Sequence, residues 1–312
     1  MSGAHGHGHG HGHEHAHGHA PAAFNRAFAI GIALNLAFVA VEGFYGWRVN
    51  SLALLADAGH NLSDVAGLVL AWGGALAVQA RPDARHTYGW QRASILAAFF
   101  NALLLLVAMG SLAWEAIGRL GAPPATQGWT LIAVAGVGIV VNTATALLFM
   151  RGRQGDLNIR GAFLHMAGDA LVSLGVVLGG ALYLWRGWAW IDPVMSLAIA
   201  ILIVAGTWGL FRQSLHLLFD GVPEALELDK VRQALLGLPG VGGVHDLHVW
   251  AMGTSQVALT AHLVLHEPGA GSDAVLAAAV PMLQAQFGIR QVTLQTESGG
   301  YAGHCALRGE PG

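Results

Sequence analysis

ADAGHNLSDVAGLVLAW, at residues 56–72, is an apolar segment that carries an ionisable pair, His60 and Asp64. A second apolar segment, GAFLHMAGDALVSLGVVLGG, repeats the pair as His165 and Asp169. A spacing of four residues puts both side chains of a pair on one face of a helix. Two such faces turned toward each other supply two imidazoles and two carboxylates, the four ligands of a tetrahedral zinc site. A metal site buried between apolar helices indicates a transporter.

The composition indicates that most of the chain lies in a membrane. Of its 312 residues, 54% are hydrophobic and 11% are charged, whereas a soluble domain has about 25% charged residues. Six apolar stretches are each near the ~20 residues that cross ~30 Å of hydrocarbon. We therefore expect six transmembrane helices, at roughly residues 25–47, 52–79, 93–118, 128–150, 161–185 and 188–210. Both His–Asp pairs fall inside these spans, where ionisable side chains are costly and usually functional.

Arginine placement predicts the orientation of the spans. The loops after the second and fourth spans are rich in arginine, whereas the opposite loops hold only Arg48, Arg119 and Arg186. By the positive-inside rule both termini are cytoplasmic. No cleavable signal peptide is visible, and a lone Cys305 fits a reducing cytoplasm. A net charge of −3 argues against nucleic acid as a partner.

The segments outside the spans differ in composition. Residues 1–23 alternate histidine with glycine, which favours a disordered, potentially metal-binding tail; an expression tag is the alternative. The helical membrane domain is expected over 24–212, a small soluble domain over 213–300 and a tail over 301–312. The soluble domain has the pattern α-β-β-α-β, with its second helix interrupted at Pro281. This order suggests an α+β ferredoxin-like cytoplasmic domain, whose modest core dimerisation would help.

The charge of the membrane site suggests how it works. With both aspartates ionised and both histidines neutral, the site carries two negative charges, which one divalent cation or two protons neutralise. Metal binding needs deprotonated ligands, so loading one species expels the other. We therefore expect metal/proton antiport, with export driven by the inward proton gradient. A structural His–Asp contact within each helix is the alternative for either pair taken alone.

The ligand set also bears on the metal. Two nitrogens and two oxygens in a tetrahedron favour Zn²⁺, whereas Mg²⁺ and Mn²⁺ favour octahedral, oxygen-rich sites. Cd²⁺, Co²⁺ and Ni²⁺ stay open as cargo because affinity order alone does not select among them.

Other polar residues lie within the apolar spans. Asp57 precedes Asp64 by seven residues, near the same helix face. It could bind the departing ion or a proton, or it could cap the helix. Interhelical hydrogen bonding is the expected role of Glu42, Asn35, Asn101 and Asn142.

The chain resembles the cation diffusion facilitator family, in its zinc-exporting branch. The resemblance rests on the six spans, both H-x-x-x-D motifs, the HTYG stretch after the second span, Asp192-Pro193 at the sixth span and HDLHVW in the soluble domain. It implies a homodimeric, proton-coupled exporter of a bacterial-type inner membrane with a metallochaperone-like cytoplasmic domain. The transport site it implies is His60, Asp64, His165 and Asp169.

The resemblance also implies a zinc-binding module in the soluble domain. The ligand-like positions fall on His245, His262 and Glu297, and Gln295 stands where some members have a histidine. His248 and His266 are further candidates. An adjacent N,S pair that could complete the site is His304 and Cys305. Surface histidines on short strands, and a tail with an incidental thiol, are the alternatives.

A weaker site in the family lies in the loop after the second span. Here Asp83 and His86 could contribute to it, but Trp90 stands where some members have another histidine. A structural role for His86 at the membrane surface is the alternative.

Three other functions compete with zinc export. An intramembrane zinc protease needs an open metal position and a general base, typically in H-E-x-x-H, which this sequence lacks. A membrane metal sensor or storage protein without net flux is suggested by the histidine-rich tail. An importer of the same architecture is not distinguished by sequence, because flux direction depends on gradients.

Overall fold

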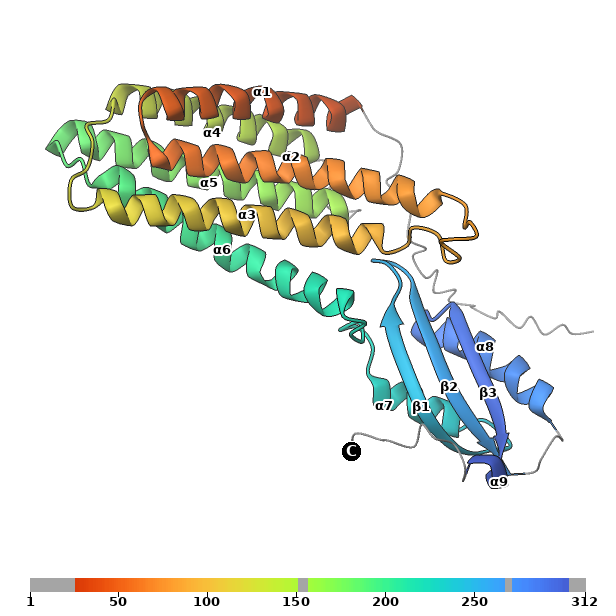
Figure 1. Ribbon diagram of the computed structural model, residues 1–312. Helices are drawn as coiled ribbons and strands as arrows, with labels where there is room; N and C mark the ends of the chain where they lie inside the picture. The colour runs from red at the N-terminus through yellow and green to blue at the C-terminus, as the bar shows by residue number, and fades with distance from the viewer. Residues whose placement is uncertain (1–25, 151–156, 267–270, 303–312) are drawn as a thin grey trace, which may run out of the picture.

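The computed structural model describes residues 26–150, 157–266 and 271–302 (Figure 1). The expected N-terminal tail, and the C-terminal tail from residue 303, lie outside this part of the chain. Long helices form a bundle, and a small sheet flanked by helices follows the last of them. The bundle helices are α1 (Arg26–Arg48), α2 (Leu52–Gln79), α3 (Ala93–Arg119), α4 (Gly128–Met150), α5 (Leu157–Arg186) and α6 (Ile191–Leu218).

The bundle helices alternate in direction (Figure 1), and the consecutive pairs α1–α2, α2–α3, α4–α5 and α5–α6 pack against each other. α2 is the most central of them, since it contacts α1, α3, α5 and α6. α4 packs along α5 and α3 along α6 (Figure 1). The contact between α2 and α5 brings the two His–Asp segments onto adjoining helices.

The bundle buries polar side chains beside its apolar core and exposes many large apolar side chains on its outside. Glu42, Asp57 and Asn142 have exposed fractions of 0%, whereas Trp114 is 80% and Val140 67% exposed. Large exposed apolar surfaces are stable against lipid rather than water. The surface pattern therefore supports a membrane environment for the bundle.

Tryptophans mark one end of the bundle, where α1, α3 and α5 end and α2, α4 and α6 begin. Aromatic side chains are enriched where the membrane meets water. The exposed members of this group are Trp47, Trp114, Trp129, Trp185, Trp188 and Trp190. The arginine-rich loop between α2 and α3 lies at the opposite end, so the two ends differ as two membrane surfaces do.

Four helices of the described residues are long and apolar enough to cross a membrane. They cover Ala93–Arg119, Gly128–Leu147, Met166–Arg186 and Ile191–Leu218. α1 and α2 pack in the same bundle and have 23 and 28 residues, but the six-span arrangement stays a prediction. The sixth helix continues to Leu218, beyond the end expected from composition.

The N-terminus of α2 is held by α6. The Ser51 hydroxyl accepts a hydrogen bond from the Leu54 N–H at 3.3 Å and donates one to the Asp192 carboxylate. The second oxygen of Asp192 accepts the Leu52 N–H at 2.9 Å. Ser51 is 0% and Asp192 5% exposed, so a shielded carboxylate faces the positive end of the α2 dipole. Asp192 therefore ties two helices together.

The C-terminal unit consists of α7 (Leu228–Leu236), β1 (Val241–Ala251), β2 (Val257–Leu265), α8 (Ser272–Phe287), β3 (Gln291–Ser298) and the short α9 (Gly299–Ala302). From α7 to β3 this is the order α-β-β-α-β expected from sequence. β1 is antiparallel and β3 parallel to the central β2. The three strands described are one fewer than a ferredoxin-like sheet has, so that fold class stays a prediction.

The interruption expected at Pro281 does not occur. α8 runs unbroken from Ser272 to Phe287. Pro281 and Ala277, whose carbonyl loses its N–H donor, are both exposed, so water can satisfy that carbonyl. The opposite face of α8 packs on the core of the unit and holds the helix together, through the buried Val275, Ala279 and Leu283.

The hairpin between β1 and β2 rests against the start of α3 (Figure 1). The Thr254 N–H donates to the Ser94 hydroxyl at 3.1 Å. A Cβ added to Gly253 would lie 2.8 Å from a backbone carbonyl oxygen just before α3, so a larger residue there would push the hairpin away. At the same end, Arg92 forms an ion pair with Asp220, which follows α6. The start of α3 thus holds both the β1–β2 hairpin and the residue that follows α6.

We predict that Asp192→Ala destabilises the bundle, because the Leu52 N–H and the Ser51 hydroxyl would stay buried without their acceptor. Hydrogen bonds to a charged group contribute about 1.5–3 kcal/mol, so the thermal unfolding midpoint in detergent should fall clearly. Asp192→Asn keeps one acceptor oxygen and should lose less. Glu224→Ala, at an exposed position, is the control; an equal midpoint for Asp192→Ala and this control would refute the tie.

Candidate metal centres

Two helices supply the candidate site in the bundle. α2 carries His60 and Asp64 one turn apart, and α5 supplies Asp169. His60 Nε2 lies 3.5 Å from Asp169 Oδ1 and 3.7 Å from Asp64 Oδ2. The imidazole is therefore placed between a carboxylate of its own helix and one from the adjoining helix.

Each of these two distances, taken alone, is close to that between two donors of one ion, but His60, Asp64 and Asp169 do not form a group of the described residues whose ligand atoms all lie within 4.8 Å of one another. Ligand atoms ~2.0–2.2 Å from zinc in a tetrahedron lie roughly 3.4 Å from one another. The exposed fraction rises from 4% for the Asp169 side chain through 18% for His60 to 30% for Asp64. The three side chains thus run from the buried Asp169 to the more exposed Asp64, which marks a route by which an ion would reach His60.

His165 lies in α5 one turn before Asp169, on the same helix face. Its side chain lies outside what the structure describes. The structure therefore brings His60 close to Asp64 and to Asp169, and a site shared by all four residues stays a prediction. A His–Asp contact within one helix does not account for the approach of His60 to Asp169, because that approach joins α2 to α5.

Hydrogen bonds join α2 to its neighbours around this site. The Asn61 side-chain amide donates to Glu42 Oε2 at 3.4 Å, which links α2 to α1. The Ser63 hydroxyl donates to Asn101 Oδ1 at 3.4 Å, which links α2 to α3. Glu42 and Asn101 therefore make the interhelical hydrogen bonds expected of them, and Asn35 donates to Met166 Sδ of α5 at 3.6 Å. The expectation is wrong for Asn142, whose side-chain amide has no hydrogen-bond partner among the described residues.

Asp57 does not cap α2, since Ser51 occupies that position. Asp57 lies beyond the first turn, is 0% exposed and accepts a hydrogen bond from the Ser173 hydroxyl of α5 at 3.2 Å. The capping alternative is therefore excluded, and a role in binding an ion or a proton is left.

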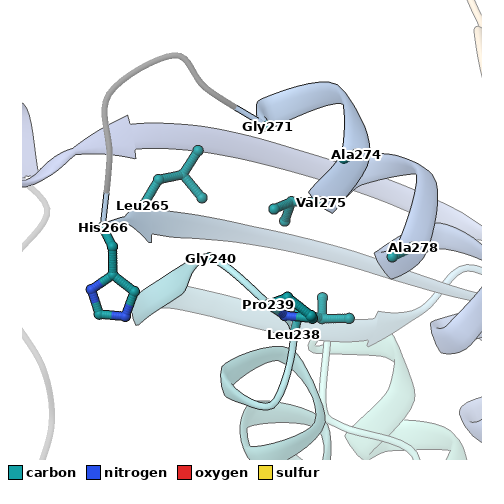
Figure 2. A pocket seen from close by; sticks show the side chains of 9 residues that line it. All are labelled: Leu238, Pro239, Gly240, Leu265, His266, Gly271, Ala274, Val275 and Ala278. Carbon is teal, nitrogen blue, oxygen red and sulfur yellow. The ribbon is translucent and has the colours of Figure 1, made fainter.

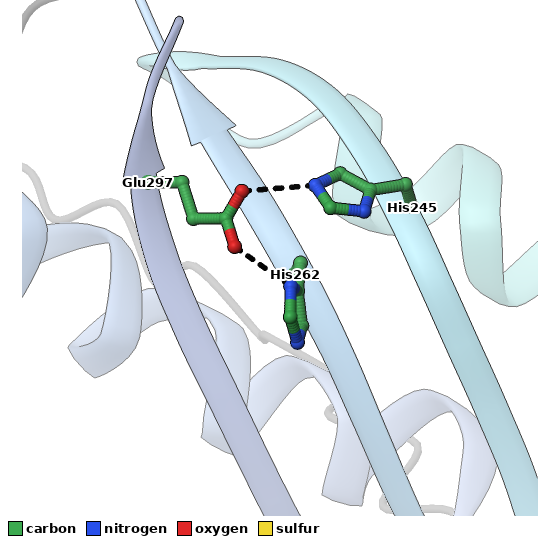
Figure 3. A group of neighbouring side chains, drawn as sticks. All are labelled: His245, His262 and Glu297. Atoms are coloured by element: carbon green, nitrogen blue, oxygen red, sulfur yellow. Dashed lines mark hydrogen bonds and ion pairs between the residues drawn. The ribbon is translucent and has the colours of Figure 1, made fainter. Parts of the chain in front are cut away.

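A second candidate centre lies on the sheet of the C-terminal unit (Figure 3). His245 of β1 and His262 of β2 are cross-strand partners, and Glu297 comes from β3. Glu297 Oε2 lies 3.0 Å from His245 Nε2, and Glu297 Oε1 lies 2.7 Å from His262 Nδ1. The Glu297 side chain is 0% exposed, the histidines 12% and 15%. The strand register thus gathers three donors in a place largely shielded from water.

This donor set suits a zinc ion. Ligand atoms of the three residues lie within 4.8 Å of one another, and two imidazoles with one carboxylate form a known zinc ligand set. The Gln295 amide donates to Glu297 Oε1 at 2.9 Å, so the residue that replaces a histidine orients the carboxylate.

Sequence reasoning missed Asp246 as a member of this group. A register shift between His245 and His248 places an extra residue in β1, and Asp246 has a φ of 49° there. Asp246 Oδ2 lies 3.6 Å from His262 Nε2, and its Oδ1 lies 2.8 Å from His248 Nε2. Asp246 therefore extends the cluster at its more exposed edge.

The bulge explains why Asp246 was missed. Strict alternation would point it to the face opposite His245, whereas a bulge lets two successive residues share a face. The sequence did carry a signal, because the apolar core positions Val244 and Leu247 are three residues apart, while Leu247 and Val249 are two apart. A three-residue step within an alternating strand indicates a bulge.

The loop between α2 and α3 holds the other predicted ligands. Asp83 Oδ1 accepts hydrogen bonds from the N–H groups of His86 at 2.6 Å and Arg85 at 2.7 Å. These bonds, first that from His86, lower the pKa of Asp83 from its ordinary value. The His86 ring stacks on Trp90 with centroids 4.3 Å apart. Within the described residues no third ligand joins a cluster here, so a metal role for Asp83 and His86 stays a prediction.

His266, another candidate ligand, lines a cavity of about 430 Å³ beside α8 (Figure 2). Its lining is apolar apart from backbone and the His266 ring, with Leu265 and Val275 among the lining residues. One imidazole without other donors does not make a metal site. His304 and Cys305, the remaining candidates, lie outside the described residues.

Protein-family models match both parts of the chain. Residues 28–219 match the model described as "Cation efflux transmembrane domain". Residues 223–299 match the model described as "Cation efflux protein, cytoplasmic domain". The first match covers nearly all of α1–α6 and the second covers α7–β3, so the two matches meet where the bundle gives way to the C-terminal unit.

Known proteins are similar over most of the chain. The "Cation efflux system protein CzcD" of Alcaligenes sp. is 36% identical over 278 residues, 89% of this chain and 88% of that protein. The "Zinc transporter ZitB" of Escherichia coli is 36% identical over 275 residues, 86% of each. The "Cadmium, cobalt and zinc/H(+)-K(+) antiporter" of Bacillus subtilis is 33% identical over 244 residues, 78% of each.

Among solved structures, the "Metal-bound C-terminal domain of the CzcD transporter" from Cupriavidus metallidurans is 36% identical. It covers 23% of this chain and 99% of that chain, with a TM-score of 0.22.

We predict that the cluster of His245, His262 and Glu297 binds one zinc ion per chain. Glu297→Gln should weaken this binding by more than about 100-fold, and Asp246→Asn, which alters a supporting contact, by about 10–100-fold. Equilibrium dialysis of the full chain against zinc, with the metal counted per chain, measures both. His266→Asn is the control because that ring lies apart from the cluster; an equal zinc content in Glu297→Gln and this control would contradict the prediction.

Proposed function

This chain belongs to the cation efflux family, and we propose that it exports Zn²⁺ from the cytoplasm in exchange for protons. It is a transporter and not an enzyme, since the relatives matched over most of its length are efflux proteins and transporters. Two of these relatives are named as zinc transporters, one of them for cadmium and cobalt as well. We propose Zn²⁺ as the cargo, protons as the counter-ions and the site between α2 and α5 as the transport site.

One observation carries the proposed transport site. His60 lies within 3.7 Å of carboxylate oxygens from both α2 and α5. A site shared by two helices can be closed or opened by a small relative shift of those helices, as alternating access requires. We assign the four ligands to His60, Asp64, His165 and Asp169.

Proton coupling follows from the charge of this site. The aspartates and neutral histidines carry two negative charges that a low-dielectric interior does not tolerate uncompensated. Either a divalent cation or protons can compensate them, and the metal needs the deprotonated ligands. Export of the cation is then exchanged for inward movement of protons. The Bacillus subtilis relative, a "Cadmium, cobalt and zinc/H(+)-K(+) antiporter", is consistent with such coupling.

The proposal includes a topology. α1 to α6 would each cross a bacterial inner membrane, with both termini and the C-terminal unit in the cytoplasm. Arg81, Arg85 and Arg92, in or beside the loop between α2 and α3, lie at the cytoplasmic end under this arrangement. The C-terminal unit, with its ferredoxin-like pattern, would form a homodimer and bind regulatory zinc at His245, His262 and Glu297.

The donor atoms bear on which metal ions are carried, and the N-terminal segment bears on how they reach the site. The nitrogen donors favour Zn²⁺ over Mg²⁺ and leave Cd²⁺, Co²⁺ and Ni²⁺ as alternatives. The histidine-rich segment at residues 1–23 would raise the metal concentration near the cytoplasmic entrance. Net movement of metal across the membrane distinguishes an exporter from a metal sensor or storage protein.

We predict that His60→Ala and Asp169→Ala reduce zinc flux to the level of protein-free liposomes while the proteins still insert into the membrane. Each change removes a donor from a site that has too few ligands to replace it. Zinc uptake into proteoliposomes, followed with an internal zinc dye, measures the loss. His266→Ala is the histidine control outside the bundle. Flux retained by His60→Ala would remove this residue from the site.

We also predict that zinc uptake drives protons out of proteoliposomes, because each cation displaces protons from its ligands. The internal pH should rise on addition of zinc, as reported by an internal pH dye. An imposed gradient with an acidic interior should accelerate uptake. Zinc flux that changes neither with the pH gradient nor on addition of a protonophore would contradict proton coupling.

A further inference from the structure

Two carboxyl groups that are not among the proposed ligands lie deep in the bundle. Glu42 of α1 and Asp57 of α2 are both 0% exposed. One oxygen of each has a donor, since Asn61 donates to Glu42 Oε2 at 3.4 Å and Ser173 donates to Asp57 Oδ2 at 3.2 Å. The carboxyl groups are therefore held in place from α2 and α5.

The other two oxygens, Glu42 Oε1 and Asp57 Oδ1, are buried and receive no hydrogen bond from an N–H or O–H of the described residues. Asp57 and Asn61 lie one turn apart on the same face of α2, so the hydrogen bond from Asn61 places Glu42 beside Asp57. A carboxylate has no proton to donate, so a hydrogen bond between two carboxyl groups requires one of them to be an acid. A single shared proton satisfies this geometry.

Among the described residues, no buried lysine or arginine lies beside the pair to take the place of that proton. α2 adds the imidazole of His60, and α5 adds the carboxylate of Asp169. The buried polar residues of α4 are neutral, namely Asn142 and Thr145. No lysine or arginine is among the buried side chains of the described residues. Two adjacent carboxyl groups in such a place do not both ionise.

We propose that Glu42 and Asp57 form a proton-binding site separate from the metal ligands, and that this site releases its proton when a divalent cation binds beside it. The inference rests on the proposed function, because it assumes a cation at His60 and Asp169. Asp57 precedes His60 by three residues, about 4.5 Å along the helix. The arriving positive charge stabilises the second carboxylate, and the carboxylic acid becomes a carboxylate as H⁺ leaves.

This site adds to the protons exchanged for each metal ion. The ligands themselves release protons when the metal displaces them, and the Glu42–Asp57 pair contributes one more. The two sources are separable, since Glu42→Gln and Asp57→Asn alter the pair and leave His60, Asp64, His165 and Asp169 in place.

The test counts the protons released when saturating zinc is added to the full chain in weakly buffered detergent. Wild type should release about one proton per chain more than Glu42→Gln or Asp57→Asn. Glu115→Gln, a matched change at a half-exposed position of α3, should release as many as wild type. Equal release by wild type and both pair variants would overturn the proposal.

Infrared difference spectra of wild type with and without zinc give a second readout that needs no variant to fold. The carbonyl band of a protonated carboxyl group should disappear on zinc binding. A carbonyl band that persists with zinc bound would overturn the proton site. So would the absence of this band from the zinc-free protein together with zinc binding that depends on potassium or sodium. Proton release with an infrared band loss, but zinc flux indifferent to the pH gradient, would instead refute the proposed antiport alone.

Discussion

Negative charge buried between apolar helices is the constraint that organises the bundle. Glu42, Asp57 and Asp169 are all nearly or fully buried, and an ionised carboxylate at the bilayer centre costs about 2.5–3.5 kcal/mol on insertion scales. No buried lysine or arginine of the described residues offsets them. Protons and metal cations are the remaining means of neutralisation. Their competition for the same carboxylates is the physical link between metal movement and proton movement that we propose.

α2 is the helix on which this arrangement depends. It carries Asp57, His60 and Asp64, and it contacts α1, α3, α5 and α6. Its first turn is held by Asp192, and Asn61 and Ser63 bind neighbours on either side. The helix is therefore fixed at one end and along its length, and small shifts of α5 against it would change the distance from His60 to Asp169.

The two candidate metal centres use similar donors on different scaffolds. In the bundle, His60 and Asp169 come from separate helices without a backbone hydrogen bond between them. On the sheet, backbone ladders lock the strands that carry His245, His262 and Glu297. A site between helices can open by sliding, whereas a site on a hydrogen-bonded sheet keeps its geometry. The first scaffold suits a cargo that must leave and the second a resident ion.

The sequence by itself determined the long helices and the order of elements in the C-terminal unit, because apolar periodicity and glycine- or proline-rich connections are local signals. It also placed each His–Asp pair on one helix face, since a spacing of four residues suffices for that. Only the tertiary structure decided that α2 adjoins α5, that Asp192 holds the start of α2, that Pro281 stays within α8, and that a bulge turns Asp246 toward His262. The first three depend on residues far apart in the chain or on which face is buried, which no local pattern specifies. The bulge has a local signal in the spacing of Val244 and Leu247, but the approach of Asp246 to His262 depends on how the strands pair.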